Sequence, residues 1–336
     1  MKKALYLQIL ILVALLIATA VVCVQLNNDP ALAVMGPGEV PEETENVPET
    51  TTEPPFVITW MELPENRELT ASVYFVYDCD TEQFLTLSGD ASDVVYPASI
   101  TKLFTAYIAM QYVEPTDEVT AGDELDFVGW GSSVAEIEKG NILTVDMLVR
   151  AMLLPSGNDA AYVLAAHAGR AILRDDSASA QRAVDAFMTE MNRQAKNLGM
   201  TGSHFANPDG IHADDHYMTI GDLAILGKLS MSNPTVLNNA TVSSQNVTFV
   251  SGEKKLWENT NELVNPNSQY YCPIAVGLKT GQTPTAGSCL LSGFTAKDKN
   301  LVIGVFGCPE KDDRFPDTLQ LLNETLEELG LLDEGN

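Results

Sequence analysis

The sequence predicts an α+β fold in which both ends of the folded region contribute strands to one antiparallel sheet, with a mainly helical insert packed beside it. Residues 71–77 combine small, β-branched and aromatic residues in a strand-like alternation, and strand patterns return after residue 274. From residue 99 to about 229 the apolar residues recur with a helical period instead, and we place the insert at about 99–250. We expect the functional cleft between the sheet and this insert.

The first 25 residues are predicted to be a membrane anchor or a signal segment. Lys2 and Lys3 precede an almost unbroken apolar run at residues 4–24, which is long enough to cross a membrane. Because the run is longer than the usual apolar region of a cleaved signal, we expect an uncleaved anchor. The positive charges place its amino-terminal end in the cytoplasm, so the domain is expected at the extracytoplasmic face of the cell membrane. Cleavage after Ala33, which would release a secreted protein, stays open because residues 31–33 have the small-residue form of a cleavage site.

Residues 26–56 are predicted to be a disordered acidic stalk. The segment 36–55 is rich in Pro, Glu and Thr and contains six glutamates but no basic residue. Such a composition buries too little apolar surface to offset the entropy lost on ordering. The folded domain is therefore assigned to residues 57–336.

The acidic balance excludes one large class of function. The 336-residue chain has 46 acidic and 19 basic residues and a net charge of −27, whereas nucleic-acid binders need clustered Lys and Arg. The five cysteines and four histidines show no zinc-binding or redox spacing, and the sequence has no phosphate-binding or dinucleotide-binding glycine motif. We therefore expect no nucleic-acid partner, no metal and no cofactor, while disulfide pairing is left open.

The elements of the folded region follow one another in a simple order. Residues 71–77 and 84–87 are predicted to be two strands joined through an acidic turn, and a closing amphipathic helix is expected at 316–329. The helical pattern of the insert is clearest at 145–154 and 159–168. The closing strands are expected at 275–279, 289–295 and 301–307, with a turn at 297–300.

Ser99 and Lys102 form the first candidate motif, at the start of an apolar helix. Positions i and i+3 share one helix face, with Cβ atoms about 5–6 Å apart, so the lysine can reach the serine hydroxyl. Unpaired N–H groups in the first helical turn suit a developing oxyanion. A lysine with its ordinary pKa of about 10.4 is almost never neutral at pH 7, so burial or neighbouring cations must lower the pKa before Lys102 can act as a base.

Two further motifs follow in the chain. Ser156 and Asn158 lie on a short loop between two predicted helices, where a hydroxyl and a carboxamide can orient the lysine and a substrate amide. Lys279 and Thr280 end an apolar strand and offer a charge and a donor to a carboxylate, while Gly281 lets a substrate backbone approach. Each motif therefore lies on the kind of element that its chemistry requires.

Each motif alone is weak, because such short patterns also occur by chance. Ser251 with Lys254, and Ser244 with Asn246, repeat two of the patterns. Their Val, Thr, Gly and Glu neighbours predict strands and turns, so we interpret these residues as surface positions. The specific signal is the ordered set of three motifs.

The ordered set resembles the serine-type D-alanyl-D-alanine carboxypeptidases, which are the low-molecular-mass penicillin-binding proteins. The resemblance covers about residues 70–308 and implies a β-lactamase/transpeptidase-like fold. It also implies removal of the terminal D-alanine of peptidoglycan stem peptides through an acyl-enzyme, with β-lactams such as penicillins as covalent inhibitors. The segments that carry it are Pro97-Ala98-Ser99-Ile100-Thr101-Lys102, Leu154-Pro155-Ser156-Gly157-Asn158-Asp159-Ala160, Leu198-Gly199-Met200, His204-Phe205-Ala206-Asn207-Pro208-Asp209-Gly210-Ile211-His212, Thr219-Ile220-Gly221-Asp222-Leu223-Ala224 and Gly277-Leu278-Lys279-Thr280-Gly281.

The resemblance also implies a role for each site residue. Ser99 is the nucleophile and Lys102 the general base, and Ser156 and Asn158 assist proton transfer and bind the substrate amide. The implied substrate-binding residues are Lys279 and Thr280, which hold the terminal carboxylate, Gly281, and Gln282, whose N–H forms the oxyanion hole with that of Ser99.

Three points are left open by this resemblance. Asp209 stands where many relatives carry His, which puts its part in catalysis in doubt. A class A-like β-lactamase would need a deacylating glutamate with an asparagine four positions later, and Glu190 has nearly the right spacing but is followed by Gln194. A catalytically silent penicillin-binding sensor could share the fold, although all the catalytic side chains are intact here.

Overall fold

The computed structural model describes residues 67–332. The predicted membrane segment at residues 1–25 and the predicted stalk at residues 26–56 lie outside the described residues, so both stay predictions. In the described part of the chain, no helix combines the length and the apolar character needed to cross a membrane. The cysteines of this part, Cys79, Cys272, Cys289 and Cys308, are buried free thiols.

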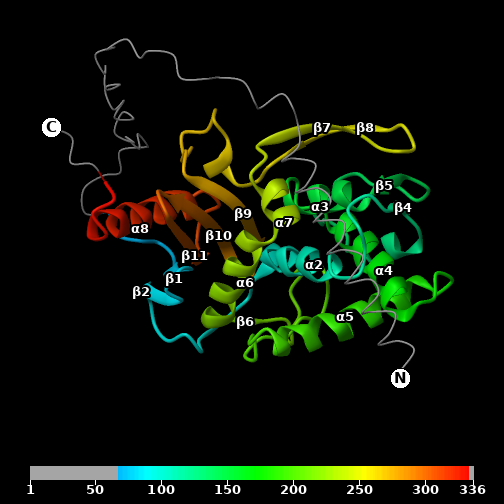
Figure 1. The fold of residues 1–336 in the computed structure, drawn as a ribbon, viewed down its shortest axis with the longest axis horizontal. Coiled ribbons are helices and arrows are strands. Elements are labelled where there is room, and N and C mark those ends of the chain that lie inside the picture. Colours follow the sequence, from blue (N-terminus) through cyan, green and yellow to red (C-terminus); the bar gives the residue numbers. More distant parts are fainter. Residues whose placement is uncertain (1–66, 333–336) are drawn as a thin grey trace, which may run out of the picture. The chain divides into compact units, whose positions relative to one another are not determined.

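A five-stranded antiparallel sheet takes its strands from both ends of the described chain, as the sequence predicts (Figure 1). The strand order is β2-β1-β11-β10-β9, so the first strand lies beside the last. The closing strands run beyond their predicted ends, and only residues 297 and 298 join the last two of them, with Lys297 at a φ of 54°. The strands are β1 (Val73–Asp78), β2 (Gln83–Leu87), β9 (Ala275–Thr283), β10 (Gly287–Ala296) and β11 (Lys299–Cys308).

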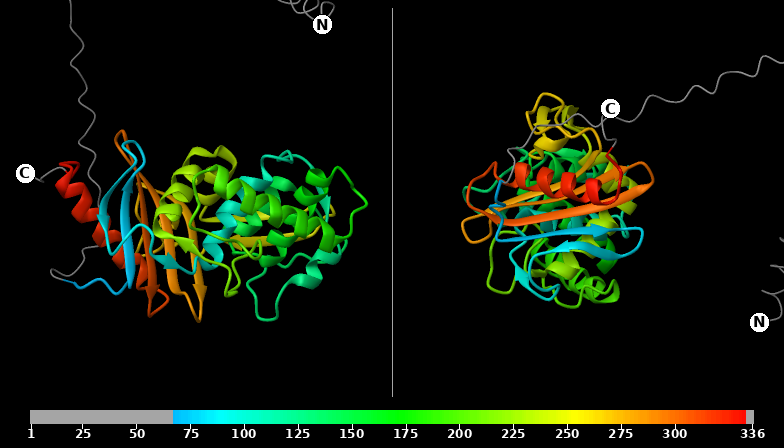
Figure 2. Two further views of the ribbon diagram at one scale, coloured as in Figure 1. Left: turned by 90° about the horizontal axis from the view of Figure 1, so that it is seen from below. Right: turned by 90° about the vertical axis from the view of Figure 1, so that its left-hand side faces the viewer.

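The sheet lies between helix α8 (Arg314–Glu328) and the helical region (Figure 2). Successive residues of a strand point to opposite faces of a sheet, and β1 shows both faces. Val76 packs in the apolar cluster that contains Phe315 and Leu322 of α8, whereas Phe75 belongs to the cluster shared with the helical region. Burial of each such large apolar side chain contributes about 1.5–3 kcal/mol, so both layers hold the sheet.

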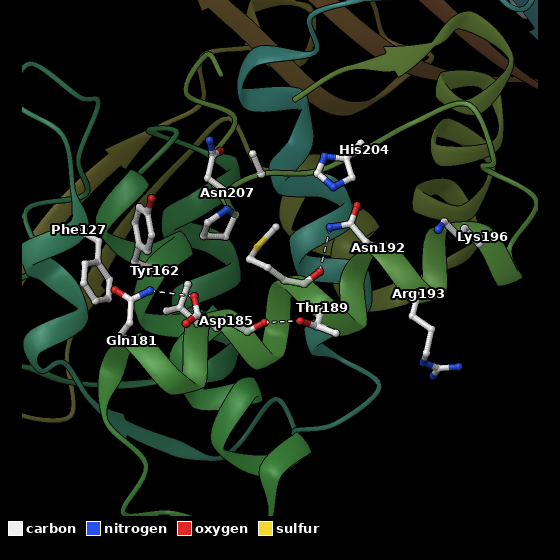
Figure 3. A pocket seen from close by; sticks show the side chains of 14 residues that line it. Phe127, Tyr162, Gln181, Asp185, Thr189, Asn192, Arg193, Lys196, His204 and Asn207 are labelled. Carbon is white, nitrogen blue, oxygen red and sulfur yellow. Dashed lines mark hydrogen bonds between the residues drawn. The ribbon is translucent and has the colours of Figure 1, made fainter. Parts of the chain in front are cut away.

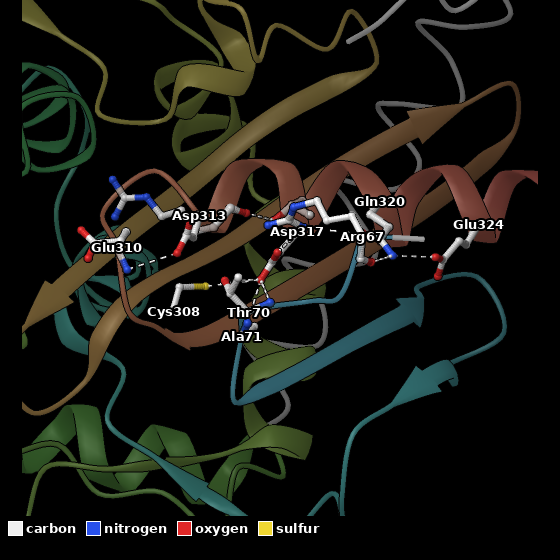
Figure 4. Close-up of polar contacts among 11 residues, drawn as sticks. Arg67, Thr70, Ala71, Cys308, Glu310, Asp313, Asp317, Gln320 and Glu324 are labelled. Atoms are coloured by element: carbon white, nitrogen blue, oxygen red, sulfur yellow. Dashed lines mark hydrogen bonds and ion pairs between the residues drawn. The ribbon is translucent and has the colours of Figure 1, made fainter. Parts of the chain in front are cut away.

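A buried carboxylate ties the start of the sheet to α8 (Figure 4). One oxygen of Asp317 accepts hydrogen bonds from the N–H groups of Thr70 and Ala71, at 2.9 and 2.7 Å, and from the Thr70 hydroxyl at 2.9 Å. The other oxygen pairs with the Arg67 guanidinium at 2.5 Å. Because a buried carboxylate is costly without such partners, these contacts fix the segment leading into β1 against the last helix.

The helical region is built around α2 (Thr101–Ala109), which is buried almost all round. The expected helical pattern fails at residues 110–144, where Pro115 and several glycines interrupt it and the chain forms short strands and a 3₁₀ turn.

Ser244 and Ser251 lie on a β-hairpin, which confirms their strand-and-turn assignment. The helical elements are η2 (Ala98–Ile100), η3 (Asp123–Phe127), α3 (Val145–Leu153), α4 (Asn158–Leu173), α5 (Ala180–Asn197), α6 (Ile220–Ser232), α7 (Pro234–Ala240) and η4 (Glu262–Val264). The short strands pair as β3 (Val94–Val95) with β6 (Met218–Thr219), β4 (Glu118–Thr120) with β5 (Ile142–Thr144), and β7 (Ser244–Thr248) with β8 (Lys254–Glu258).

The turn η2, which carries Ser99, is held between two glycines. A Cβ atom on Gly210, whose φ is +86°, would lie 1.8 Å from the carbonyl oxygen of Ala98, and one on Gly281 would lie 2.9 Å from that of Pro97. Ala98 itself has a φ of 49°, a left-handed conformation that costs about 1–2 kcal/mol for an L-residue. Backbone from the helical region and from β9 therefore packs directly on this turn, and only glycine leaves room for it.

Gly210→Ala should strongly destabilise the protein. The added methyl group would meet backbone atoms that cannot move without displacing the serine turn, so we expect the free energy of unfolding in urea to fall by at least about 3 kcal/mol. Gly252→Ala is the matched control, because Gly252 also has a positive φ, of +107°, but nothing lies within 4 Å of its Cβ position. The control should lose only the conformational cost of about 1–2 kcal/mol. Equal losses in the two variants would contradict the importance of the close approach at Gly210.

Candidate active site

A cavity of about 600 Å³ opens where the sheet meets the helical region, as the sequence predicts for the functional cleft. Its walls are formed by η2, by the loop between α3 and α4, by β9 and by the residues before α8. Of the predicted site residues, Ser99, Ser156, Thr280, Gly281 and Gln282 line the cavity, Lys102 and Lys279 are fully buried, and Asn158 is buried at the start of α4.

Lys102 directs its amine to Ser99. The Nζ atom donates to Ser99 Oγ at 2.8 Å and to the backbone oxygen of Asp209 at 2.8 Å. The pair spans a 3₁₀ turn and the first turn of α2, so Ser99 lies just before the α-helix. Burial lowers the pKa of Lys102 to about 8, although the carboxylates of Asp209 and Asp159 oppose this change. The neutral amine is thus accessible near neutral pH, and its lone pair can accept the serine proton.

Ser156 is held in a left-handed backbone conformation between α3 and α4. Its φ is 66°, which is strained for an L-residue, and the residue is buried. Flanking backbone bonds fix the loop: the Gly157 N–H donates to the Ala151 oxygen at 2.9 Å, and the Asn158 N–H donates to the Ser133 oxygen at 2.8 Å. The Asn158 carboxamide makes no hydrogen bond to another described site residue, which leaves it to a substrate amide.

Lys279 lies buried behind the part of the cavity lined by Thr260, Thr280 and Arg314, which we call the cationic wall. Its Nζ donates to the backbone oxygen of Thr280 at 3.1 Å and to Thr260 Oγ1 at 3.3 Å, and the two threonine hydroxyls are 2.6 Å apart. Burial, and then the positive charges of Lys102 and Arg314, lower the pKa of Lys279 well below its ordinary value. An anionic group bound here would offset this repulsion, so the wall suits a carboxylate.

Thr260 and Arg314 are cavity residues that the sequence analysis missed. Arg314 is only 2% exposed, and its guanidinium donates to the Gly281 backbone oxygen at 3.3 Å and lies 5.0 Å from the centre of the Phe315 ring. Its Nε has no hydrogen-bond partner among residues 67–332. Neither residue belongs to a recognisable sequence pattern, and only the fold brings them to β9, so no sequence signal could have identified them.

Gly281 is needed for close packing of β9 against the turn that carries Ser99. The sequence predicts that this glycine admits a substrate backbone, but its Cβ position is already approached by the Pro97 oxygen at 2.9 Å and by the Ala98 Cβ at 3.0 Å. The backbone nitrogen of Ser99 lies 3.3 Å from the same position. The two expected oxyanion donors, the N–H groups of Ser99 and Gln282, therefore belong to adjacent stretches of backbone.

A second hollow, of about 750 Å³, runs along α5 and is lined in part by His204, Ala206, Asn207 and Pro208 (Figure 3). No serine or cysteine is among its lining residues. Glu190, the glutamate of the β-lactamase alternative, also belongs to α5, where its carboxylate accepts from Arg193 Nε at 2.7 Å. Because no residue of α5 lines the cavity that contains Ser99, Glu190 is not placed to activate a deacylating water.

Comparison with known proteins identifies a matching family and several similar sequences. The model of the D-alanyl-D-alanine carboxypeptidase family, Peptidase_S11, matches residues 60–310. D-alanyl-D-alanine carboxypeptidase DacF of Bacillus subtilis is 26% identical over 240 residues, which cover 70% of this chain and 57% of the relative. DacA of Escherichia coli strain K12 is 29% identical over 255 residues, which cover 73% of this chain and 58% of the relative. The match thus spans little more than half the length of these curated relatives.

Solved structures agree with the fold. The DD-transpeptidase of Streptomyces K15 has a TM-score of 0.69 at 26% identity, over 78% of this chain and 98% of that one. Penicillin-binding protein D2 from Listeria monocytogenes, in its ampicillin-bound form, has a TM-score of 0.61 at 27% identity, over 77% of this chain and 98% of that one. The expected β-lactamase/transpeptidase-like fold is confirmed, and since the family model covers most of the chain, the protein belongs to the D-alanyl-D-alanine carboxypeptidase family.

Proposed function

We propose that this chain is a serine-type D-alanyl-D-alanine carboxypeptidase, which removes the terminal D-alanine of peptidoglycan stem peptides through an acyl-enzyme on Ser99. The observation that carries the proposal is the 2.8 Å contact between Lys102 Nζ and Ser99 Oγ at the wall of an open cavity. The family match at residues 60–310 supports the reaction. The ampicillin-bound relative supports β-lactams as ligands of this chain, and we propose that they inhibit it by acylating Ser99.

Acylation begins when the neutral amine of Lys102 takes the hydroxyl proton of Ser99. The serine oxygen bonds to the carbonyl carbon of the penultimate D-alanine, and negative charge develops on the carbonyl oxygen, towards which the N–H groups of Ser99 and Gln282 donate. When the C–N bond breaks, the proton passes from the Lys102 ammonium to the leaving nitrogen. D-alanine departs as the free amino acid, and the peptide stays on the serine as an ester.

Hydrolysis of this ester restores the enzyme. Lys102, neutral again, accepts a proton from the attacking water and returns one to the serine oxygen as the C–O bond breaks. Ser156, on the same cavity wall, assists these transfers, while the Asn158 carboxamide holds the substrate amide. The same residues therefore serve both halves of the reaction.

The terminal carboxylate of the substrate is held at the cationic wall. Arg314 supplies positive charge there, and the hydroxyls of Thr260 and Thr280 supply hydrogen bonds. A bound carboxylate also favours the ammonium form of Lys279, whose pKa is lowered by burial and by the charges of Lys102 and Arg314. Charge-assisted hydrogen bonds to a carboxylate are about twice as strong as neutral ones. A free carboxylate at the end of the peptide is thus the feature that this wall selects.

The enzyme is proposed to act at the extracytoplasmic face of the cell membrane, held there by residues 4–24. The apolar run and the preceding Lys2 and Lys3 support this orientation. The acidic composition of residues 26–56 supports a spacer between the bilayer and the domain. This placement brings the cavity to the side of the membrane where peptidoglycan lies.

Ser99→Ala should fold normally and form no covalent adduct with a fluorescent penicillin. Without the attacking oxygen, release of D-alanine from a pentapeptide should fall by about 10³-fold or more. Intact-protein mass spectrometry and a D-alanine assay measure the two effects, with Ser251→Ala as the control that should keep both. Labelling of Ser99→Ala would contradict the assignment of the nucleophile. Labelling of the unmutated protein without D-alanine release would instead indicate a catalytically silent sensor.

The acylation rate should rise with pH until Lys102 is neutral. Because the pKa of Lys102 is lowered to about 8, the second-order rate constant for penicillin should increase about tenfold per pH unit below that value and level off above it. Stopped-flow fluorescence between about pH 6 and 9.5 measures this profile. Lys102→Arg should abolish acylation, because a guanidinium stays protonated throughout. A flat profile across this range would exclude Lys102 as the general base.

Arg314→Leu should weaken recognition of the substrate carboxylate. Loss of a charged hydrogen bond should lower kcat/KM for a peptide acid by roughly 10- to 100-fold, with much less effect on the corresponding peptide amide, while Arg314→Lys should restore part of the loss. Lys311→Leu is the matched control, because Lys311 also lines the cavity but is exposed. Equal losses for acid and amide, measured on variants with unchanged thermal stability, would contradict this role of Arg314.

A further inference from the structure

The side chain of Asp209 lies buried beside Lys102 with one oxygen unused. Asp209 is 1% exposed. Its Oδ1 accepts from the Ile211 N–H at 3.0 Å, whereas its Oδ2 has no hydrogen-bond partner within residues 67–332. Its backbone oxygen accepts from Lys102 Nζ at 2.8 Å, so the base and the carboxyl-bearing residue are in direct contact.

The loop that carries Asp209 cannot easily turn this side chain to solvent. The Pro208 oxygen accepts from Thr105 Oγ1 of α2 at 2.7 Å, and Asn207 Oδ1 accepts from the Gly210 N–H at 2.8 Å. Gly210 also packs its backbone against the serine turn. The carboxyl group is therefore held inside the protein by bonds on both sides of it, and burial of such a group without partners is unfavourable unless a charge compensates it.

The other titratable groups near Asp209 and Lys102 already have partners or are neutral, so Lys102 is the counter-ion that remains for the Asp209 carboxylate. From α4, the Asp159 carboxylate is occupied by the N–H groups of Ala135, Ile137 and Ala160, and burial raises the pKa of Tyr162, an effect to which Asp209 adds. His216, bonded to Thr101, is kept neutral because burial lowers its pKa to about 4. From β9, the Lys279 amine is bonded to Thr280 and Thr260.

We propose that Asp209 is a positioning residue whose carboxylate stabilises the ammonium form of Lys102 while that amine holds the proton taken from Ser99. The inference rests on the proposed function. The Ser99 O–H bond breaks and a Lys102 N–H bond forms, so a positive charge appears on Nζ as the negative charge moves to the substrate carbonyl oxygen. Asp209 exchanges no proton in this step, and a buried anion beside Nζ lowers the energy of the charge that develops there.

The electrostatic role predicts the sign of a pH effect. Burial raises the pKa of Asp209, but the positive charge of Lys102 opposes that change, and reciprocally the Asp209 charge raises the pKa of Lys102. Asp209→Asn removes this charge, keeps the size of the side chain and leaves an oxygen for the Ile211 N–H. In the full chain, we expect the acid limb of penicillin acylation to move to lower pH by about one unit and the plateau rate to fall roughly tenfold.

Two further variants separate charge from structure. Asp209→Ser, which is neutral and smaller, should shift the acid limb in the same direction and provides the test if Asp209→Asn does not fold. Asp222→Asn is the matched control, because Asp222 is a buried carboxylate that accepts from the Gly202 N–H and the Ser203 hydroxyl and has no contact with Lys102. It should lower thermal stability and leave the pH limb in place.

A direct titration of Lys102 decides the matter independently of catalysis. In protein labelled with ¹³C at the lysine Cε, the Lys102 resonance should titrate about one unit lower in Asp209→Asn than in the unmutated chain. An unchanged titration midpoint in both neutral variants would overturn the role of Asp209. If the unmutated protein neither acylates nor releases D-alanine, the proposed function fails, while the titration still tests the Asp209 to Lys102 interaction.

Discussion

Close packing of backbone around the serine turn is the constraint on which the site depends. Gly210 and Gly281 bring main chain so near to this turn that Cβ atoms would lie 1.8 and 2.9 Å from the carbonyl oxygens of Ala98 and Pro97. One glycine belongs to the helical region and the other to the sheet. Backbone packed on backbone cannot repack as side chains do. The turn therefore fixes how the two walls of the cavity approach Ser99.

Three basic side chains are buried around the candidate site of this acidic protein. Lys102 and Lys279 are fully buried, and Arg314 is nearly so. Removal from water lowers the pKa of Lys102, which the proposed base requires. A bound anion would stabilise the charged forms of Lys279 and Arg314, since burial removes their hydration and the positive charges repel one another. The net charge of −27 describes the chain as a whole and does not set the local field inside the cavity. An overall negative charge is therefore compatible with a site that binds an anion.

The sequence could predict those features that depend on neighbouring residues. The contact between Lys102 and Ser99 follows from spacing within one turn, and the strands follow from local alternation. Strand ends could not be predicted in the same way, because β9 continues to Thr283 only where β10 pairs with it. The contacts of Arg314 and Asp209 could not be predicted for a similar reason. Arg314 contacts Gly281, 33 positions away, and Asp209 contacts Lys102, 107 positions away. No spacing rule tells which loop faces a buried amine.

Asp317 also restricts the order in which the domain can assemble. Its carboxylate bonds Thr70, 247 positions earlier, and β1 becomes an inner strand only by pairing with β11. Closing such long loops costs entropy before any contact compensates for it. The hairpin of β1 and β2 therefore joins the sheet only once β11 is available to pair with β1. A chain emerging from a ribosome completes its sheet after β11 has emerged, and Asp317 fixes the segment before β1 only after α8 has followed.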